Sequence, residues 1–183
     1  PAEVAEKEGL TKACRILPQT GKISNCISFP YTVDGELVNR KYRDGAKNFM
    51  LEAGARLVPW RIDHIRDTPA CIITEGEMDA LSFIVAGYDN VVSAPNGAQR
   101  NLTWLDDFIE THFENKERIY IAVDTDTKGL ELRNELVRRF GEGACRIVTY
   151  GKDCKDANEL LQQGGVEAVR RAVDEAQEIP LEG

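Results

Sequence analysis

The sequence lacks the residue spacings of a structural zinc site. It has only two histidines, and its five cysteines are scattered and never form a Cys-x-x-Cys pair. Structural zinc sites are built from cysteine and histidine at short, regular spacings, so we expect no zinc in this chain. The cysteines are instead predicted to be free thiols in a reducing compartment, which favours a cytoplasmic protein.

Long hydrophobic runs are also missing. No apolar stretch approaches the roughly 20 residues that a membrane-spanning helix needs, and no signal-peptide pattern opens the chain. We therefore expect no contact with a membrane. The 183 residues, 42% of them hydrophobic and 30% charged, are enough for one globular core with a small appendage. The chain begins with Pro1 rather than Met, so we expect it to be a piece of a longer protein.

An excess of positive charge is absent as well. The net charge is −8 at pH 7, which argues against a protein that binds nucleic acid over its whole surface. The charge is unevenly divided, however. Residues 1–70 carry 11 basic and 9 acidic side chains, whereas residues 71–183 carry 12 and 22. The first part has a net charge of +2 and the second of −10, so we expect the two parts to differ in role.

The first third of the chain predicts a small β-rich lobe. Residues 1–22 are predicted to be a loosely held entry segment. A β-hairpin is predicted next, because two β-rich runs flank Asp34-Gly35, a strong two-residue turn signal, in CISFPYTVDGELVNRKYRDG. Thr68-Pro69 then interrupts the chain, since a residue before proline avoids helical backbone. We therefore predict an N-terminal segment and small basic lobe over 1–68, and an α/β domain with C-terminal helices over 69–183.

From residue 71 onward, predicted strands and helices alternate. The predicted strands are ACIIT, NVVSA, RIYIAV and CRIVTY. The predicted helices are EMDALSFIVAG, LTWLDDFIETHF, KGLELRNELVRRFG, DANELLQQGG and VEAVRRAVDEAQ. Such alternation predicts an α/β fold with a parallel sheet of about four strands flanked by helices.

Two aspartates follow the third predicted strand, with one residue between them, in IYIAVDTDTKG. In a parallel α/β sheet, ligands bind beyond the carboxyl ends of the strands. Side chains two apart on an extended strand project to the same side, so the carboxylates of Asp124 and Asp126 are expected to converge and repel each other. A hard cation such as Mg²⁺, which prefers oxygen ligands, would resolve this repulsion. The alternative is that Asp126 or Thr127 is the N-cap of the next helix.

Acidic residues also follow the first and fourth predicted strands. Glu75 stands at the end of the first strand, and the following Gly76 allows the backbone to approach a ligand closely. Asp79 lies one helical turn later and could face the same crevice, although acidic residues also favour the first turn of a helix because of its dipole. Asp153 and Asp156 follow the fourth strand, and either could be an N-cap.

These motifs together resemble the TOPRIM domain, over about residues 71–160. The resemblance rests on TEGEMDAL, on SAPNG with its turn glycine Gly97, and on AVDTDTKG. It implies that Glu75 is a general acid/base or a metal-linked carboxylate. The implied ligands of Mg²⁺, for which Mn²⁺ could substitute, are Asp124 and Asp126, with Asp79 and Asp156 as weaker candidates for a second ion.

Among TOPRIM proteins, the sequence is most similar to the primase branch. EGEMDALS is similar to the EG-x-x-D pattern of bacterial and phage primases, and GKDCKDANELL resembles the KDANE stretch of phage and mitochondrial primase-helicases. The hairpin resembles the basic subdomain that precedes TOPRIM in those proteins. The candidates for binding template phosphates or an incoming nucleotide are Arg40, Lys41, Arg43, Lys47 and Lys128. A solvated hairpin face is the alternative for the first four.

The resemblance implies the catalytic core of a DnaG-type or phage-type DNA primase. The expected activity is metal-dependent phosphoryl transfer, which makes RNA primers on single-stranded DNA from nucleoside triphosphates during replication. A replicative helicase is a further candidate partner. No zinc module or helicase P-loop is recognisable, so the fragment could be inactive by itself. The alternatives are a TOPRIM nuclease that hydrolyses phosphodiesters and a non-catalytic module that binds DNA or a partner; no catalytic-tyrosine domain of a topoisomerase fits this length.

Overall fold

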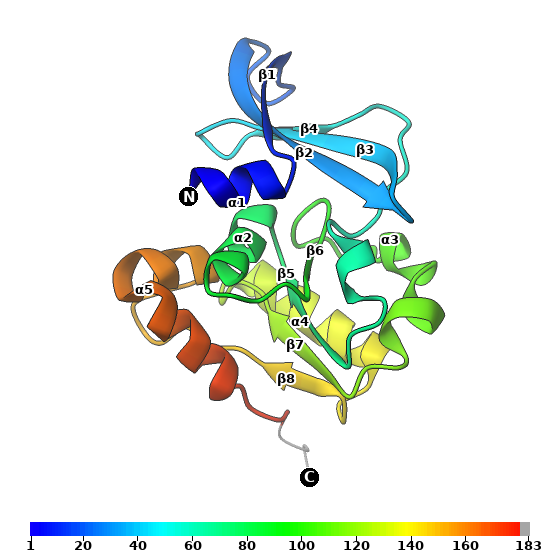
Figure 1. Cartoon of the computed structure of the whole chain (residues 1–183), viewed down its shortest axis with the longest axis vertical. Helices are drawn as coiled ribbons and strands as arrows, with labels where there is room; N and C mark the ends of the chain where they lie inside the picture. Colours follow the sequence, from blue (N-terminus) through cyan, green and yellow to red (C-terminus); the bar gives the residue numbers. More distant parts are fainter. Residues whose placement is uncertain (180–183) are drawn as a thin grey trace.

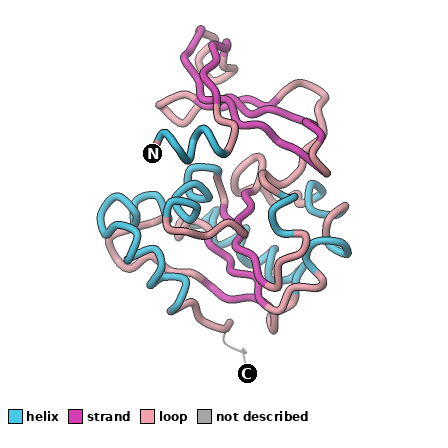
Figure 2. Tube along the Cα trace, viewed as in Figure 1, coloured by secondary structure: helices cyan, strands magenta, loops and turns pink. Residues whose placement is uncertain are grey.

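Two four-stranded sheets organise residues 1–179, the part of the chain that the computed structural model describes (Figures 1 and 2). The first sheet is antiparallel, in the order β1 (Thr11–Ile16), β2 (Ile23–Val33), β3 (Glu36–Arg43) and β4 (Phe49–Leu51). The second is parallel, in the order β6 (Val91–Ser93), β5 (Ala70–Thr74), β7 (Arg118–Ala122) and β8 (Cys145–Ile147). A parallel sheet of four strands that follows a β-rich lobe confirms the predicted fold class.

Helices flank the parallel sheet. They are α2 (Glu77–Val85), α3 (Thr103–Asp106), the π-helical turn η2 (Ile109–Phe113), α4 (Thr127–Phe140) and α5 (Ala157–Asp174), and the short η1 (Ile62–Ile65) precedes β5. Helices α2 and α5 pack against each other. Helix α5 is bent at Gly165, whose φ of 72° breaks the helical backbone, so the two predicted closing helices are joined end to end. Within residues 1–179, no helix is long and apolar enough to cross a membrane.

Strands β2 and β3 form the predicted hairpin. Asp34 and Gly35 at its turn have φ values of 51° and 79°, the left-handed conformation that a two-residue hairpin turn requires. Successive side chains of a strand point to opposite faces of the sheet. Lys41 and Arg43 of β3 therefore share one face, and Arg40 lies on the other.

One hydrophobic core extends from the antiparallel sheet into the parallel one. It contains the fully buried rings of Phe29 and Tyr31 from β2, together with Trp60 from the segment that connects the sheets. The Trp60 ring packs edge-on against Phe29, its indole N–H donates to the carbonyl of Pro30 at 3.0 Å, and its backbone bridges to Ser93 of β6. This segment therefore holds the lobe against the edge of the parallel sheet. The predicted domain boundary after residue 68 stays a prediction.

The prediction of a loosely held entry segment at residues 1–22 is wrong. These residues contain α1 (Ala2–Lys7) and β1, and β1 pairs along its whole length with β2. Glu8, just after α1, forms a buried ion pair with Arg61 at 2.8 Å. Leu17 is also fully buried in a small cluster of the lobe and Leu10 packs against the main core, so apolar contacts, backbone pairing and this ion pair hold the segment in place.

The single helix predicted for LTWLDDFIETHF is also wrong. Only Thr103–Asp106 is α-helical, and the backbone N–H of Glu114 bonds to the carbonyl of Ile109, five residues earlier. Such a π-helical turn is wider than an α-helical one. The adjacent side chains of His112 and Phe113 in this turn are both buried.

Candidate metal and nucleic-acid site

Carboxylates from three loops meet at the carboxyl edge of the parallel sheet. Glu75 follows β5, Asp124 follows β7, Asp156 follows β8, and Asp79 lies in the first turn of α2. One carboxylate oxygen from each of Asp79, Asp124 and Asp156 lies within 4.8 Å of the other two. We call these three residues the acidic triad. It stands at the edge where parallel α/β sheets bind their ligands.

Burial and mutual repulsion raise the pKa values of these carboxyl groups. The pKa of Glu75 rises from 4.5 to about 7, mainly because the group is desolvated and then because of the charges of Asp124 and Asp126. The pKa of Asp124 rises from 3.8 to about 6 through desolvation and the charges of Asp156 and Asp126. Burial, followed by the other triad charges, raises the pKa of Asp79 well above its usual value. A cation bound among them would relieve this repulsion.

Three buried polar atoms at or beside this cluster have no hydrogen-bond partner among residues 1–179. They are Glu75 Oε1, Asp124 Oδ1 and the hydroxyl oxygen of Tyr150. Burial and the charges of all four carboxylates raise the pKa of Tyr150 well above 10. An unsatisfied buried polar group costs about 1–3 kcal/mol, and more when it is charged. Clustered carboxylate oxygens that lack protein partners fit a hard, oxygen-preferring ion such as Mg²⁺ or Mn²⁺.

Two of the predicted acidic residues cap helices. Asp126 is the N-cap of α4 and accepts a hydrogen bond from the backbone N–H of Gly129 at 2.7 Å, which confirms the capping alternative. Strand β7 ends at Ala122, so the side-chain alternation expected for the Asp-x-Asp pair does not extend to Asp126. Asp156 is the N-cap of α5 and accepts from the backbone N–H of Glu159 at 2.8 Å, and it also belongs to the acidic triad.

Glycines give the site its shape. Gly76 begins α2 in an extended conformation and lines the pocket beside the carboxylates, with open space where a side chain would project. Gly97 has a left-handed φ of 71° and lines the same pocket. Gly129, in the first turn of α4, was missed by the sequence reasoning. A Cβ at Gly129 would lie 2.0 Å from the carbonyl oxygen of Asp124, so only glycine lets α4 start this close to the strand end.

Two of the predicted basic residues, Arg43 and Lys47, face the carboxylates. Both line a pocket of about 200 Å³ together with Glu75 and the acidic triad. The loop after β3 that carries Lys47 is held by Asp44, whose carboxylate accepts hydrogen bonds from the backbone N–H groups of Ala46 and Asn48, each at 2.9 Å. Lys47 itself adopts a left-handed φ of 68°, a conformation that is unfavourable for a non-glycine residue.

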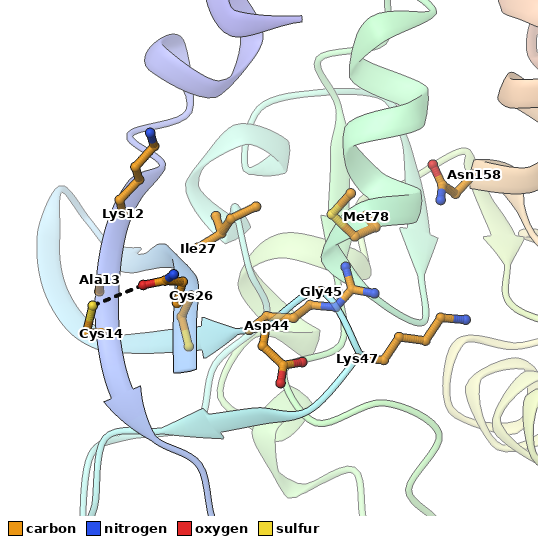
Figure 3. A pocket seen from close by; sticks show the side chains of 12 residues that line it. Lys12, Ala13, Cys14, Cys26, Ile27, Asp44, Gly45, Lys47, Met78 and Asn158 are labelled. Carbon is orange, nitrogen blue, oxygen red and sulfur yellow. Dashed lines mark hydrogen bonds between the residues drawn. The ribbon is translucent and has the colours of Figure 1, made fainter. Parts of the chain in front are cut away.

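A larger groove of about 890 Å³ continues from this pocket along the lobe (Figure 3). Arg43 and Lys47 line both cavities, and Lys12 of β1 adds a third positive charge to the groove. Figure 3 shows Met78 of α2 at the side of the groove opposite β1. The basic residues of the lobe are thus arranged along a channel that leads to the acidic triad.

Of the three remaining basic candidates, Lys41 also lines the pocket of the carboxylates, whereas Arg40 and Lys128 do not. Arg40, on the opposite face of β3, donates to the hydroxyl of Ser28 at 3.2 Å. Lys128 is exposed in the first turn of α4 and lines neither cavity described above. Lys41 is buried, and its ammonium group bonds to Glu77 of α2. Glu77 was missed by the sequence reasoning, because an acidic residue in the first turn of a helix is usually solvated.

Comparisons with known proteins agree with this geometry. Residues 72–161 match the family described as Toprim-like. The primase fragment of the bacteriophage T7 primase-helicase has a similar structure, with a TM-score of 0.77 and 24% sequence identity; the match covers 93% of this chain and 69% of that one. The matched segment is therefore a TOPRIM domain, and its fold is the one found in primases.

Two curated relatives come from Arabidopsis thaliana. The chain is 35% identical over 173 residues to "Primase homolog protein", a match that covers 85% of this chain and 51% of the relative. It is 33% identical over 175 residues to "Twinkle homolog protein, chloroplastic/mitochondrial", a match that covers 86% of this chain and 25% of the relative. The chain thus spans about half of one curated relative and a quarter of the other.

Proposed function

We propose that this chain is the metal-dependent phosphoryl-transfer core of a DNA primase. The observation that carries the proposal is the acidic triad, in which three carboxylates share one site and face Arg43 and Lys47 across a common pocket. Acidic residues that hold a cation beside basic residues that hold phosphate are the parts that phosphoryl transfer requires. The names of the relatives support a primase in particular.

In this proposal, Asp79, Asp124 and Asp156 hold Mg²⁺, and Asp126 completes the site with the carboxylate oxygen that does not cap α4. When bound, the ion neutralises charge on the triphosphate and polarises the phosphorus that is attacked. Mn²⁺ is expected to substitute, because it also prefers oxygen ligands.

The other site residues move a proton and hold the substrates. The reaction joins the 3′ oxygen of a ribonucleotide to the α-phosphorus of the next nucleoside triphosphate, and pyrophosphate leaves. Glu75, whose pKa is about 7, accepts the proton of the 3′ hydroxyl near neutral pH. Arg43 and Lys47 bind phosphate groups of the nucleotide or the template, and Arg40 and Lys128 add outer positive charges. The substrates are a single-stranded DNA template and nucleoside triphosphates.

Extension of an annealed primer tests this function directly. A short RNA annealed to single-stranded DNA is incubated with the chain, a labelled ribonucleoside triphosphate and Mn²⁺ or Mg²⁺. Starting from an annealed RNA removes the need for other parts of a primase that assist initiation. We expect the wild-type chain to add nucleotides, and Asp124→Asn and Glu75→Gln to reduce the rate by about 100-fold or more.

Asp153→Asn is the matched control, because Asp153 lies in the same loop as Asp156 but outside the acidic triad. Its rate should equal that of the wild type. Shortening of the nucleic acid in place of extension would indicate a TOPRIM nuclease. Binding of the primed template without either reaction would indicate a non-catalytic module. A replicative helicase as partner and a cytoplasmic location both stay predictions.

A further inference from the structure

A buried ion pair joins the lobe to the catalytic edge of the parallel sheet. Lys41 of β3 and Glu77 of α2 have side chains only 5% and 3% exposed. The ammonium nitrogen of Lys41 lies 2.9 and 3.0 Å from the two carboxylate oxygens of Glu77 and 2.9 Å from the carbonyl oxygen of Pro95. An ammonium group has three hydrogens. All of them are used in these contacts, so none is left for a phosphate.

Further contacts from the lobe complete this arrangement. The hydroxyl of Tyr31 in β2 donates a hydrogen bond to Glu77, and the ammonium group of Lys41 lies 4.3 Å from the centre of the Phe49 ring in β4. Two hydrogen-bond donors from β2 and β3 thus converge on one carboxylate of α2, and the Phe49 ring of β4 packs against one of these donors, the ammonium group of Lys41. We call Tyr31, Lys41 and Glu77 the inter-sheet network.

The residues that this network holds flank the candidate active site on both sides. Glu77 stands two residues after Glu75 and two before Asp79, at the start of α2. Pro95 stands two residues before Gly97, which lines the pocket of the acidic triad. A displacement of Glu77 or Pro95 would therefore move backbone that carries residues of the site.

We infer that Lys41 is a positioning residue, which fixes the turn after β5 and the loop after β6 against the lobe, and that it does not bind nucleotide phosphate. The sequence predicts phosphate binding for Lys41, because this residue belongs to a basic cluster. The inference assigns it a positioning role in place of that one. It rests on the proposed function only in so far as the acidic triad is a metal site. Lys41 and Arg43 lie on the same face of β3 and line the same pocket, but the hydrogens of the Lys41 ammonium group are all engaged, so Arg43 is the residue of this strand that meets phosphate.

Two variants distinguish a positioning role of Lys41 from phosphate binding. One removes the charge of Lys41 alone, and the other removes both charges of the pair. Lys41→Met leaves the Glu77 carboxylate buried without its cation, which is strongly destabilising in buried pairs. We expect the melting temperature to fall by roughly 10 °C and the affinity for Mn²⁺ to fall by about tenfold or more. Lys41→Met/Glu77→Gln contains no buried charge at this position, and the glutamine carbonyl still accepts from Tyr31. This double variant should recover most of the melting temperature, the Mn²⁺ affinity and the binding of a nucleoside triphosphate with Mn²⁺.

Lys116→Met is the matched control. Lys116 is also a buried lysine, but it has no carboxylate partner among residues 1–179 and lies at the other end of β7. Its variant should retain Mn²⁺ binding.

The inference is overturned if the double variant binds nucleotide as weakly as Lys41→Met while both keep the wild-type melting temperature, since Lys41 would then contact the nucleotide. It is also overturned if Lys41→Met keeps the wild-type melting temperature and Mn²⁺ affinity, since the pair would then hold neither segment in place. If Lys41→Met alone cannot be purified, a folded double variant that binds a nucleoside triphosphate with Mn²⁺ nearly as tightly as the wild type supports it, because this variant lacks the Lys41 ammonium group. If the wild type binds no Mn²⁺, the proposed function fails, and the melting temperatures still decide whether the pair positions these segments.

Discussion

At the scale of single residues, the site is defined by carboxyl groups that resist ionisation. Glu75, Asp79 and Asp124 all have raised pKa values; Asp79 is buried and the other two are half-buried, and each lies beside other acids. Raised pKa values of this kind cluster at functional sites because catalysis and ion binding require such groups. They also make the free energy of unfolding of the metal-free protein depend on pH, in a direction that can be predicted.

The first prediction concerns stability without metal. The pKa values of Glu75 and Asp124 are about 7 and about 6 in the folded state, against 4.5 and 3.8 ordinarily. The folded state therefore binds more protons than the unfolded state between about pH 4 and 7, so the free energy of unfolding should fall as pH rises through this window. Urea midpoints with EDTA at pH 5 and pH 8 measure this change.

A double variant, Glu75→Gln/Asp124→Asn, isolates the contribution of these two groups. Relative to this variant, the wild type should lose stability from pH 5 to pH 8 in EDTA and recover it when Mg²⁺ is added, since the ion binds the ionised carboxylates. A wild type that follows the double variant at both pH values would show that these groups do not have raised pKa values.

The second prediction separates the two roles of Asp156. Asparagine caps helices about as well as aspartate, whereas alanine does not. Asp156→Asn should therefore retain the cap of α5, and Asp156→Ala should unfold with a free energy lower by about 1 kcal/mol than that of Asp156→Asn. Both variants should lose metal affinity. Equal stabilities by urea denaturation would show that the bond to Glu159 does not stabilise the helix.

At the scale of helices and strands, the local pattern of the sequence predicts much of the structure. Continuous apolar runs predict the four parallel strands, and the Asp34-Gly35 turn predicts the hairpin, because each depends on neighbouring residues. The meeting of Asp79 with Asp156 depends on the order of the strands in the sheet and has no local signal. The π-helical turn after α3 and the burial of Lys41 likewise depend on packing partners that are distant in the sequence.

The third prediction tests the junction between β7 and α4. Gly129→Ala would place a Cβ 2.0 Å from the carbonyl oxygen of Asp124, and neither backbone can give way cheaply. We expect the free energy of unfolding to fall by about 3 kcal/mol, at the upper end of what overpacking costs, and metal affinity to fall because Asp124 is displaced.

Gly143→Ala is the control for this substitution. A Cβ at Gly143 meets no atom within 4 Å, and its φ is not in the left-handed region. Its stability by urea denaturation should be close to that of the wild type. If Gly129→Ala is as stable as Gly143→Ala and binds metal normally, the close approach of α4 to Asp124 is not needed for the site.

At the scale of the whole molecule, a basic lobe and an acidic domain share one core and face each other across one site. The net charge of −8 gives no indication that three basic residues, Lys12, Arg43 and Lys47, line one groove. The uneven distribution of charge along the sequence predicts that the two parts differ in role, and this stays a prediction. In the proposed function, nucleic acid approaches along the lobe and the carboxylates of the domain hold a cation.

The fourth prediction concerns the salt dependence of nucleic-acid binding. If Arg43 and Lys47 each contact a phosphate of single-stranded DNA, Arg43→Ala/Lys47→Ala should reduce the slope of log affinity against log salt concentration by roughly 1.4, because single strands lose about 0.7 for each contact. Fluorescence anisotropy at several salt concentrations measures this slope. Arg118→Ala, at the amino end of β7, is the control and should leave the slope unchanged. Equal slopes for all three proteins would mean that the channel is not the binding surface.

The most direct test of the central claim is a calorimetric titration of Mn²⁺ and Mg²⁺ into the wild type, Asp124→Asn and Asp153→Asn. Asp124 belongs to the acidic triad, whereas Asp153 is an exposed neighbour of Asp156 outside it. We predict that the wild type and Asp153→Asn bind Mn²⁺ alike and that folded Asp124→Asn has lost this binding. Equal binding by all three proteins, or no binding by the wild type at millimolar ion, would contradict the assignment of a metal site to the acidic triad.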